Sequence, residues 1–325
     1  MSYIKQALFG AAVVVLALTS GISAWAQHFP TKPIKLVVPG SPGTSTDALA
    51  RFFADRLTTK LKTPVVIENK GGAGGLLAYA GLIKAEPDGY TIMASGLPRY
   101  LLPLSPDTAA KYDPVKDFSF IARIARTPLA FVVPTQSPIR TMDDLVQAMR
   151  AKPNDLTYSS QGVGSSAHIC ASFLNELTKT KARHVAYKES ALAVTDVVGE
   201  HIDFTCQGSV GILPMVQAGR LRALAVTSAE RWGSLPDVPT VVQAGVRGFE
   251  MSPGIEFIGP AGMPASTLQM LSDALMDIGK LPQYQEMVAK FAISADMVDH
   301  RGLTAMIPEE YEYWKRATSI AFRGQ

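Results

Sequence analysis

The sequence predicts an α/β protein of two lobes, and three observations support that fold class. First, short apolar runs that end at glycine, proline or small polar residues alternate with segments of helical periodicity, which is typical of parallel βαβ units. Second, a strand, a loop of small residues and a helix follow one another twice, at residues 34–61 and 156–177. Third, the 325 residues are 47% hydrophobic and 18% charged, which suits one large or two medium globular domains.

The N-terminus has the pattern of an export signal. A weakly positive start precedes an apolar run at residues 7–18, and Ala24-Trp25-Ala26 is a small-x-small cleavage sequence, so the mature chain should begin at Gln27. The run is about 12 residues long, whereas a membrane-spanning helix needs roughly 20, although an N-terminal anchor helix is the alternative. Because no cysteine lies near the cleavage point, we do not expect a lipid anchor.

The first lobe begins with a strand that leads into a loop of small residues. Residues 39–47 carry no bulky side chain, and apolar residues at helical spacing follow them. Backbone N–H groups and the dipole at a helix N-terminus face such a loop, so we predict that it binds a carboxylate. The other elements expected here are strands at 65–68, 90–94 and 118–124, a helix at 76–83, a turn at 87–89 and a proline-rich loop at 98–114.

The second lobe repeats the arrangement. A strand at 156–159 leads into a small-residue loop at 160–166, so each lobe offers a helix N-terminus and a ligand should lie between the two. Thr141 is the expected N-cap of an earlier helix. The remaining expected elements are strands at 129–133, 184–187, 202–204, 221–226 and 255–258, and helices at 141–149, 169–177, 192–198, 267–278, 284–291 and 308–321.

Charge and cysteine content set further bounds. The formal net charge is +3 and the basic residues are scattered, so nucleic-acid binding is not expected. Cys170 and Cys206 are the two cysteines of the chain. Export permits a disulfide between them, and two separately buried thiols are the alternative.

The usual catalytic and metal-binding motifs are absent from the sequence. It has no Gly-x-Ser-x-Gly elbow, Walker loop, His-Glu-x-x-His or Cys-x-x-Cys motif, and its five histidines lack metal-ligand spacing. The glycines at 71–75 lack the spacing of a dinucleotide-binding motif and predict a tight turn. Ser166 and His168 are two residues apart at the start of one helix, where their side chains point in different directions. A hydrogen bond between a serine nucleophile and a histidine base is therefore not expected. We therefore expect no enzyme activity, no cofactor and no metal.

Many short motifs occur here in the order found in one family. They include Pro30-Thr31-Lys32-Pro33-Ile34, Glu68-Asn69-Lys70, Pro87-Asp88-Gly89-Tyr90-Thr91, Tyr112-Asp113-Pro114, Gly162-x-Gly164-Ser165-Ser166-x-His168, His184-Val185-x-Tyr187-Lys188, the run 218–227 and Leu235-Pro236-Asp237-Val238-Pro239-Thr240. Over essentially the whole mature length, the chain resembles the TctC or Bug-type periplasmic receptors of tripartite tricarboxylate transport systems.

The resemblance implies a two-lobed periplasmic-binding-protein fold, the Venus flytrap, that closes on a small carboxylate. It implies a monomer in the periplasm, soluble after removal of residues 1–26, with transporter membrane subunits as transient partners. The lobes would be 27–126 plus 254–325, and 127–253. A receptor feeding a sensor kinase, and an exported hydrolase using Ser165 or Ser166, are the alternatives.

Several positions depart from the family pattern. The usual aromatic after the first-loop proline is Gly40, a usual tryptophan and glycine align with Gly254 and Glu256, and a usual acidic position reads Cys206-Gln207-Gly208. We therefore expect a widened, less acidic cleft that favours a bulky or aromatic mono- or dicarboxylate over an amino acid. Arg99 either meets a distal carboxylate or is a solvated surface arginine. The expected ligand-binding residues are Gly40, Ser41, Gly43, Thr44, Ser45, Asp47, Ser95, Arg99, Ser160, Gly162, Val163, Gly164, Ser165, Ser166, His168 and Gln207.

Overall fold

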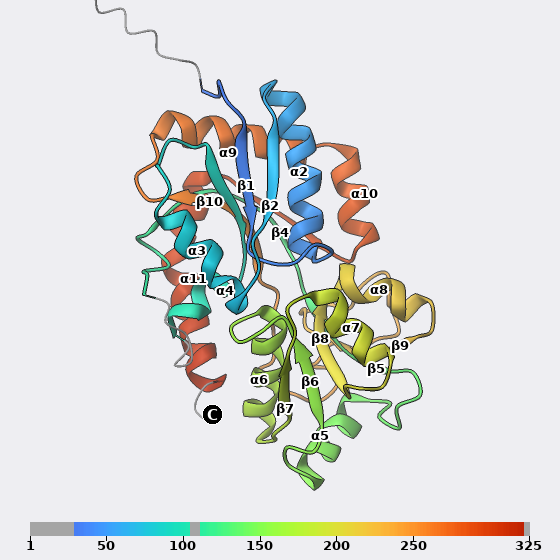
Figure 1. Cartoon of the computed structure of the whole chain (residues 1–325). Coiled ribbons are helices and arrows are strands. Elements are labelled where there is room, and N and C mark those ends of the chain that lie inside the picture. The colour runs from blue at the N-terminus through green and yellow to red at the C-terminus, as the bar shows by residue number, and fades with distance from the viewer. Residues whose placement is uncertain (1–28, 105–110, 322–325) are drawn as a thin grey trace, which may run out of the picture. The chain divides into compact units, whose positions relative to one another are not determined.

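The computed structural model describes residues 29–104 and 111–321 (Figure 1). The predicted export signal at 1–26 lies outside these residues. All the helices and strands given below belong to one compact unit that begins at Lys32. Within the described residues, no helix is long and apolar enough to cross a membrane.

The first sheet is six-stranded and mixed. Its order is β11 (Ser294–Val298), β4 (Phe118–Arg126), β10 (Gly254–Pro260), β3 (Thr91–Ser95), β1 (Ile34–Val38) and β2 (Val65–Asn69). β1 runs parallel to β2 and β3, whereas β10 is antiparallel to β3 and β4, and β11 is antiparallel to β4. The accompanying helices are α2 (Ser45–Leu61), α3 (Leu76–Ile83), α4 (Pro98–Leu101), α9 (Ala265–Gly279), α10 (Pro282–Lys290) and α11 (His300–Ala321), with short 3-10 turns η1 (Ala73–Gly75) and η2 (Leu102–Leu104).

The second sheet is five-stranded. Its order is β7 (Arg183–Ala186), β6 (Thr157–Ser160), β8 (Phe204–Gly208), β5 (Leu129–Pro134) and β9 (Leu221–Val226). β6 runs parallel to β7 and β8, whereas β5 is antiparallel to β8 and β9. Its helices are α5 (Met142–Ala151), α6 (Ser166–Thr178), α7 (Ser190–Val198) and α8 (Ser209–Gln217).

The chain passes between the sheets twice. It leaves the first sheet between β4 and β5 and returns between β9 and β10. The backbone N–H of Thr127 in the outgoing crossing donates to the carbonyl of Pro253 in the returning one, at 2.9 Å. The predicted boundaries at 126/127 and 253/254 fall within these crossings and stay predictions.

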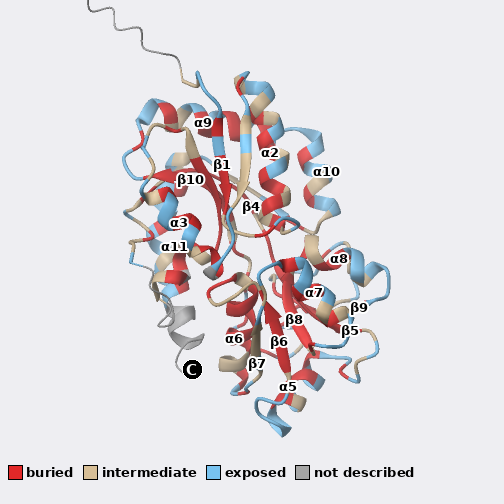
Figure 2. Ribbon diagram, in the orientation of Figure 1, coloured by how far each residue is buried: buried red, intermediate tan, exposed pale blue. Residues whose placement is uncertain are grey.

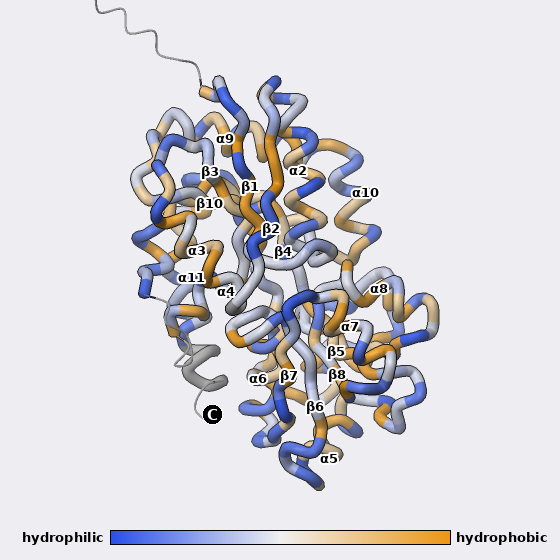
Figure 3. Tube along the Cα trace, in the orientation of Figure 1, coloured by the Kyte–Doolittle hydropathy of each residue, from blue (hydrophilic) through white to orange (hydrophobic). Residues whose placement is uncertain are grey.

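Apolar periodicity and caps explain the main elements. β5 and β6 are buried along their whole length, β3, β4 and β10 are mostly buried, and β2 and β7 are only partly buried or exposed (Figure 2). Hydrophobic residues predominate in β1 and β5, whereas β6 is mostly polar, and hydrophilic residues gather in outer turns (Figure 3). Thr141 caps α5 as predicted: its hydroxyl accepts the N–H of Asp144, whose carboxylate accepts the N–H of Thr141, forming a capping box.

Some elements differ from the expectations. The last helix starts at His300 and not at residue 308, so Pro308 lies inside it and does not open it. The strand expected at 202–204 begins later and is β8, Phe204–Gly208. Asp203 lies just before it, and its carboxylate accepts hydrogen bonds from the backbone N–H and the hydroxyl of Thr157, each at 2.7 Å. Sequence periodicity missed α4, α8 and β11, which are short or interrupted by proline.

The two cysteines are joined. Cys170 of α6 and Cys206 of β8 form a disulfide, and their Cα atoms are 6.1 Å apart. Both are fully buried. The alternative of two separate thiols is wrong, because α6 follows β6, and β6 is the neighbour of β8 in the sheet.

Candidate functional site

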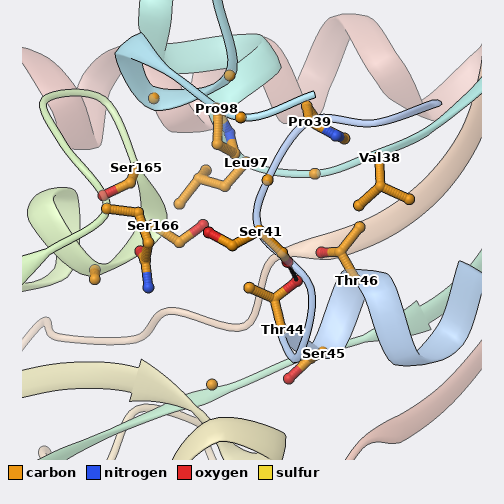
Figure 4. Close-up of a pocket in the computed structure, with 18 of the residues that line it drawn as sticks. Val38, Pro39, Ser41, Thr44, Ser45, Thr46, Leu97, Pro98, Ser165 and Ser166 are labelled. Carbon is orange, nitrogen blue, oxygen red and sulfur yellow. Dashed lines mark hydrogen bonds between the residues drawn. The ribbon is translucent and has the colours of Figure 1, made fainter. Parts of the chain in front are cut away.

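Both predicted loops line one cavity of about 120 Å³. In Figure 4, Ser165 and Ser166 of the second loop lie opposite Ser41 and Thr44–Thr46 of the first, with Leu97 and Pro98 beside them. The two N-termini of α2 and α6 therefore contribute to the same space. The lining consists of Val38, Pro39, Gly40, Ser41, Thr44, Ser45, Thr46, Gly71, Gly72, Gly74, Gly75, Gly96, Leu97, Pro98, Thr127, Leu129, Gln161, Ser165, Ser166, Ala167, Lys188, Gln207, Gly208, Pro253 and Ile255.

The first loop, residues 39–47, is stabilised by the side chain of Asp47, which does not line the cavity. Its carboxylate accepts the N–H of Gly43 at 3.0 Å, Nε of Arg51 at 3.0 Å and Nδ2 of Asn69 at 2.8 Å. Burial raises the pKa of Asp47, but these hydrogen bonds outweigh it and the pKa lies below its ordinary value. Thr44 caps α2 by accepting the N–H of Asp47. Asp47 is thus ionised and positions the loop, and it does not line the cavity.

The second loop is held by Ser165 and a pair of histidines. Ser165 caps α6 by accepting the N–H of His168. The rings of His168 and His184 lie 4.5 Å apart, and Nδ1 of His168 accepts the N–H of Gly164 at 3.4 Å. Burial, with a smaller contribution from His184, lowers the pKa of His168 to about 3, and burial lowers that of His184 to about 4. Both rings are therefore neutral near pH 7.

The cavity lining favours anions. Among the described residues that line it there is no aspartate or glutamate, and Lys188 is the one cation. Nε2 of Gln161 donates to Oε1 of Gln207 at 2.8 Å, which orients the Gln207 amide. Nε2 of Gln207 and Oγ of Ser45 are buried and have no hydrogen-bond partner within the described residues. An amide and a hydroxyl are thus left to meet a polar ligand atom.

Seven of the sixteen predicted site residues line the cavity, and the others belong to the two loops or lie elsewhere in the core. Ser95 is fully buried and its hydroxyl meets the Tyr79 hydroxyl at 3.2 Å. The cavity is lined by Gly40, Ser41, Thr44, Ser45, Ser165, Ser166 and Gln207, whereas Gly43, Asp47, Ser95, Ser160, Gly162, Val163, Gly164 and His168 lie behind it or beside it.

Arg99 is neither exposed nor part of the lining. Its side chain is fully buried, Nη2 lies 2.5 Å from Oε2 of Glu256, and Nη1 donates to the carbonyl of Pro114 at 2.6 Å. The surface alternative is wrong, and the guanidinium is already occupied by a carboxylate of the chain. Glu256, which replaces the usual glycine of the family pattern, and Arg99 therefore form one internal ion pair. The sequence alone does not show that these two positions are linked.

The loops on opposite sides of the cavity touch. The Ser41 hydroxyl accepts the N–H of Ser190 at 3.3 Å. A Cβ at Gly74 would collide with the carbonyl oxygen of Val163, and one at Gly208 would lie 2.7 Å from Oγ of Ser45. The structure thus shows a closed arrangement in which glycines allow close approach.

A serine–histidine pair occurs in a place that the sequence did not indicate. Oγ of Ser160 lies 2.6 Å from Nε2 of His184. Ser160 is fully buried and does not line the cavity, so this pair shapes the second loop. The hydroxyl of Ser165 is engaged as the cap of α6, at 3.3 Å from the backbone N of His168. Within the described residues, no group of His, Cys, Asp and Glu could hold a metal ion.

Sequence reasoning missed several lining residues. The glycine run at 71–75 predicts only a turn, yet four of its members, Gly71, Gly72, Gly74 and Gly75, line the cavity. Lys188 belongs to a motif of the family pattern, but nothing local shows that it faces the same space as residues 39–47. Pro253 and Ile255 arrive through the returning crossing, which only the fold brings to the cavity.

Comparison with known proteins identifies the family. A family model described as "Tripartite tricarboxylate transporter family receptor" matches residues 49–320. This chain belongs to that family. The receptor is 33% identical over 290 residues to the "UPF0065 protein in gbd 5'region" of Cupriavidus necator, a match covering 89% of this chain and 88% of the relative.

Solved structures support the receptor's fold. "R. palustris Rpa4515 with adipate" has 27% identity and a TM-score of 0.85, covering 90% of this chain and 98% of that one. "MatC (Rpa3494) from Rhodopseudomonas palustris with bound malate" has 26% identity and a TM-score of 0.84, covering 89% and 99%. The resemblance and the two-lobed α/β fold are confirmed: this is a solute-binding receptor of a family that is not enzymatic.

Proposed function

We propose that this receptor captures a small organic carboxylate in the periplasm and delivers it to the membrane subunits of a tripartite tricarboxylate-type transporter. One observation carries the proposal: the loops before α2 and α6 line a single cavity to which the described residues contribute no acidic side chain. Each helix N-terminus is worth about 0.3–1 kcal/mol, and up to about 2 when partly buried, to an anion placed against it.

The bound acid is proposed to be a dicarboxylate. One carboxylate would meet the backbone and hydroxyls of the two loops, at Ser41 and Ser165. The other would meet the Lys188 ammonium and the free amide of Gln207. Solved relatives are named with adipate and malate, both aliphatic diacids. A cavity of about 120 Å³ is small beside the range of about 300–1,000 Å³ for ligand pockets, which favours a compact diacid over an aromatic one.

The family and the predicted export signal support the proposed location and delivery. The receptor family is periplasmic, and residues 1–26 are proposed to be removed on export. Closure of two lobes on a ligand requires that the closed form bind the acid better than the open form. The receptor would hold the acid without turnover and release it at the membrane, which uptake assays with and without this chain would measure.

A calorimetric and thermal-shift screen tests the proposal. The chain from Gln27 onward is titrated with malate, adipate, citrate, an aromatic diacid, aspartate, glutamate and a neutral sugar. We expect 1:1 binding of an aliphatic diacid, with stabilisation of about 2.7 kcal/mol at a hundredfold excess over the dissociation constant. Response to the neutral sugar alone would overturn the carboxylate assignment, and response to aspartate or glutamate alone would show that the site selects an amino acid.

A matched pair of lysine variants tests the second contact. Lys188→Met should weaken diacid binding by tenfold or more and leave a monoacid of equal length unaffected. Lys84→Met removes an exposed ammonium outside the cavity and should change neither affinity. Equal losses for monoacid and diacid in Lys188→Met would contradict the role given to Lys188.

A further inference from the structure

A second, larger cavity lies against the other side of the two crossings. Its volume is about 1040 Å³. One wall is the segment 228–234 that follows β9, and the facing wall comes from the end of α10, the start of β11 and α11. The lining residues used below are Arg126, Glu230, Trp232, Glu250, Glu309 and Tyr313.

This cavity is separate from the carboxylate site although the two share a wall. Arg126 and Ser252 line the larger cavity, whereas their neighbours Thr127 and Pro253 line the smaller one. Successive side chains of an extended segment point to opposite sides, so each crossing presents alternate residues to the two cavities. A molecule in the larger cavity therefore contacts the crossings without entering the carboxylate site.

The larger cavity is acidic in a chain of net positive charge. Glu230, Glu250 and Glu309 are exposed and form no ion pair within the described residues. The cations of the lining are already engaged. Arg126 meets Asp296 at 2.8 Å and Glu310 at 3.0 Å, and Arg231 donates to Oε1 of Gln243 at 2.8 Å and to the carbonyl of Pro236 at 3.0 Å. In the described part of the chain, three carboxylates are left without a cation.

Aromatic side chains also line this cavity, and one of them has an N–H group without a hydrogen-bond partner among the described residues. Trp232 is 4% exposed and lines the cavity, yet its indole Nε1–H has no hydrogen-bond partner among the described residues, and neither does Oγ of Ser234 beside it. A buried indole N–H normally finds an acceptor. Tyr313 is 44% exposed and packs edge-on against Trp314 at 5.0 Å. Aromatic faces next to carboxylates suit a guanidinium or ammonium group.

We propose that this cavity binds an extended, basic segment of a partner protein. The Arg or Lys side chains of the segment would meet Glu250 and Glu309 and lie over the aromatic rings. A backbone carbonyl of the segment would accept the indole N–H of Trp232. A peptide is favoured over a small amine because the cavity is at the upper end of the range for small-molecule pockets and its three unpaired carboxylates lie on different walls.

Tryptophan fluorescence tests the site directly. The chain has three tryptophans, and the two outside the predicted export signal, Trp232 and Trp314, both line this cavity. The chain from Gln27 onward is titrated with a hexapeptide of alternating arginine and glycine, and with the same peptide carrying glutamate in place of arginine. We expect a saturable change in emission with the arginine peptide and none with the glutamate peptide.

Two double variants, each of which removes two negative charges, distinguish binding in this cavity from non-specific attraction of the basic peptide to an acidic surface. Glu250→Gln with Glu309→Gln should weaken the arginine peptide by at least tenfold. Glu86→Gln with Glu200→Gln changes two exposed carboxylates outside the cavity and should alter affinity less than twofold. Trp232→Phe, which keeps an aromatic ring but removes the indole N–H, should weaken binding by severalfold. Circular dichroism of each variant checks that it is folded.

Three results would overturn the proposal. They are an unchanged affinity in the Glu250→Gln, Glu309→Gln variant, an equal loss in the control variant, and saturation by arginine amide alone at the same concentration as by the peptide. The last would make the cavity a small-cation site. All three are independent of which acid, if any, the carboxylate site holds.

Discussion

At the scale of single residues, the approach of the two loops depends on where a Cβ is missing. Gly74 has a φ of +65° and lies against the backbone of Val163 and Gly164 across the cavity. Gly219 has nearly the same φ, +67°, but a Cβ added there would have nothing within 4 Å. An alanine at either position is strained by the positive φ, but only an alanine at Gly74 would also collide with the facing loop.

We expect Gly74→Ala to weaken ligand binding much more than Gly219→Ala. Both substitutions should cost about 1 kcal/mol of stability, because alanine is strained at a positive φ. Only Gly74→Ala also pushes the loops apart, so it should lower the affinity for the acid found in the screen by tenfold or more. Calorimetry on the two variants measures the difference. Similar affinities would show that the loops need not touch for binding.

At the scale of elements, the start of α6 is fixed to β6 and β7 by a buried aromatic group. The ring of His184 stacks on Tyr158 at 5.0 Å, and the ring of His168 lies against both. The disulfide fixes α6 to β8 about one turn into the helix. The second loop is thus held by packing and by a covalent link, and neither histidine is charged at neutral pH.

The histidines predict that stability falls in mild acid. The unfolded chain takes up protons at its histidines near pH 6.5, whereas the folded chain does so only near the depressed pKa values of about 3 and about 4. Between these limits the unfolded state binds more protons. The free energy of unfolding should therefore decrease as the pH drops from about 6.5 to about 4, by up to about 1.4 kcal/mol per pH unit for His168.

Urea denaturation at pH 7 and pH 5 measures this slope. The variant His168→Asn keeps an acceptor for the N–H of Gly164 but cannot titrate, so its stability should change less between the two pH values. A slope equal to that of the parent chain would show that other groups cause the acid sensitivity.

At the scale of the whole molecule, a buried network of charges joins the elements next to the crossings. Glu256 of β10 accepts from Arg99 at 2.5 Å and from Arg123 of β4 at 2.9 Å, and Arg123 also meets Glu310 of α11 at 2.5 Å. Burial raises the pKa of Glu256, but the two guanidinium groups outweigh it and the pKa lies below its ordinary value. The carboxylate stays ionised and balances two buried cations.

Glu256→Gln should destabilise the protein by about 3–5 kcal/mol, because it leaves a buried guanidinium uncompensated. The same substitution at Glu68, whose pair with Lys35 is 3.0 Å long and solvent-exposed, should cost about 0–1 kcal/mol. Denaturant unfolding of both variants provides the comparison. Equal and small losses would mean that the network contributes little to the stability of the fold.

Sequence reasoning was accurate wherever a signal was local. The strand and helix around residues 34–61, the N-cap at Thr141 and the two small-residue loops could be predicted, because apolar spacing and capping act over a few residues. It was less accurate for side-chain direction. Asp47 and His168 lie in the correct loops but do not line the cavity, since a motif does not show which side of a loop its members occupy.

The environment of Arg99 could not be predicted from the residues around it in the sequence. Its exposure and its partner depend on Glu256, which is far away in the chain and arrives on β10. Lys188, Gln161 and the glycines at 71–75 are likewise absent from the predicted site, because they approach the cavity from separate elements. Long-range pairing of this kind has no local signature.

The sequence by itself determined most of the helices and strands, the family, and the presence of two small-residue loops at helix N-termini, because periodicity, capping and short motifs are local properties of a chain. Only the tertiary structure decided that the loops share one space whose described lining is free of acidic residues, that Arg99 is used internally, that the cysteines are joined and that a second, acidic cavity lies behind the crossings. Each of these depends on which distant segments pack together, and packing is a property of the whole fold.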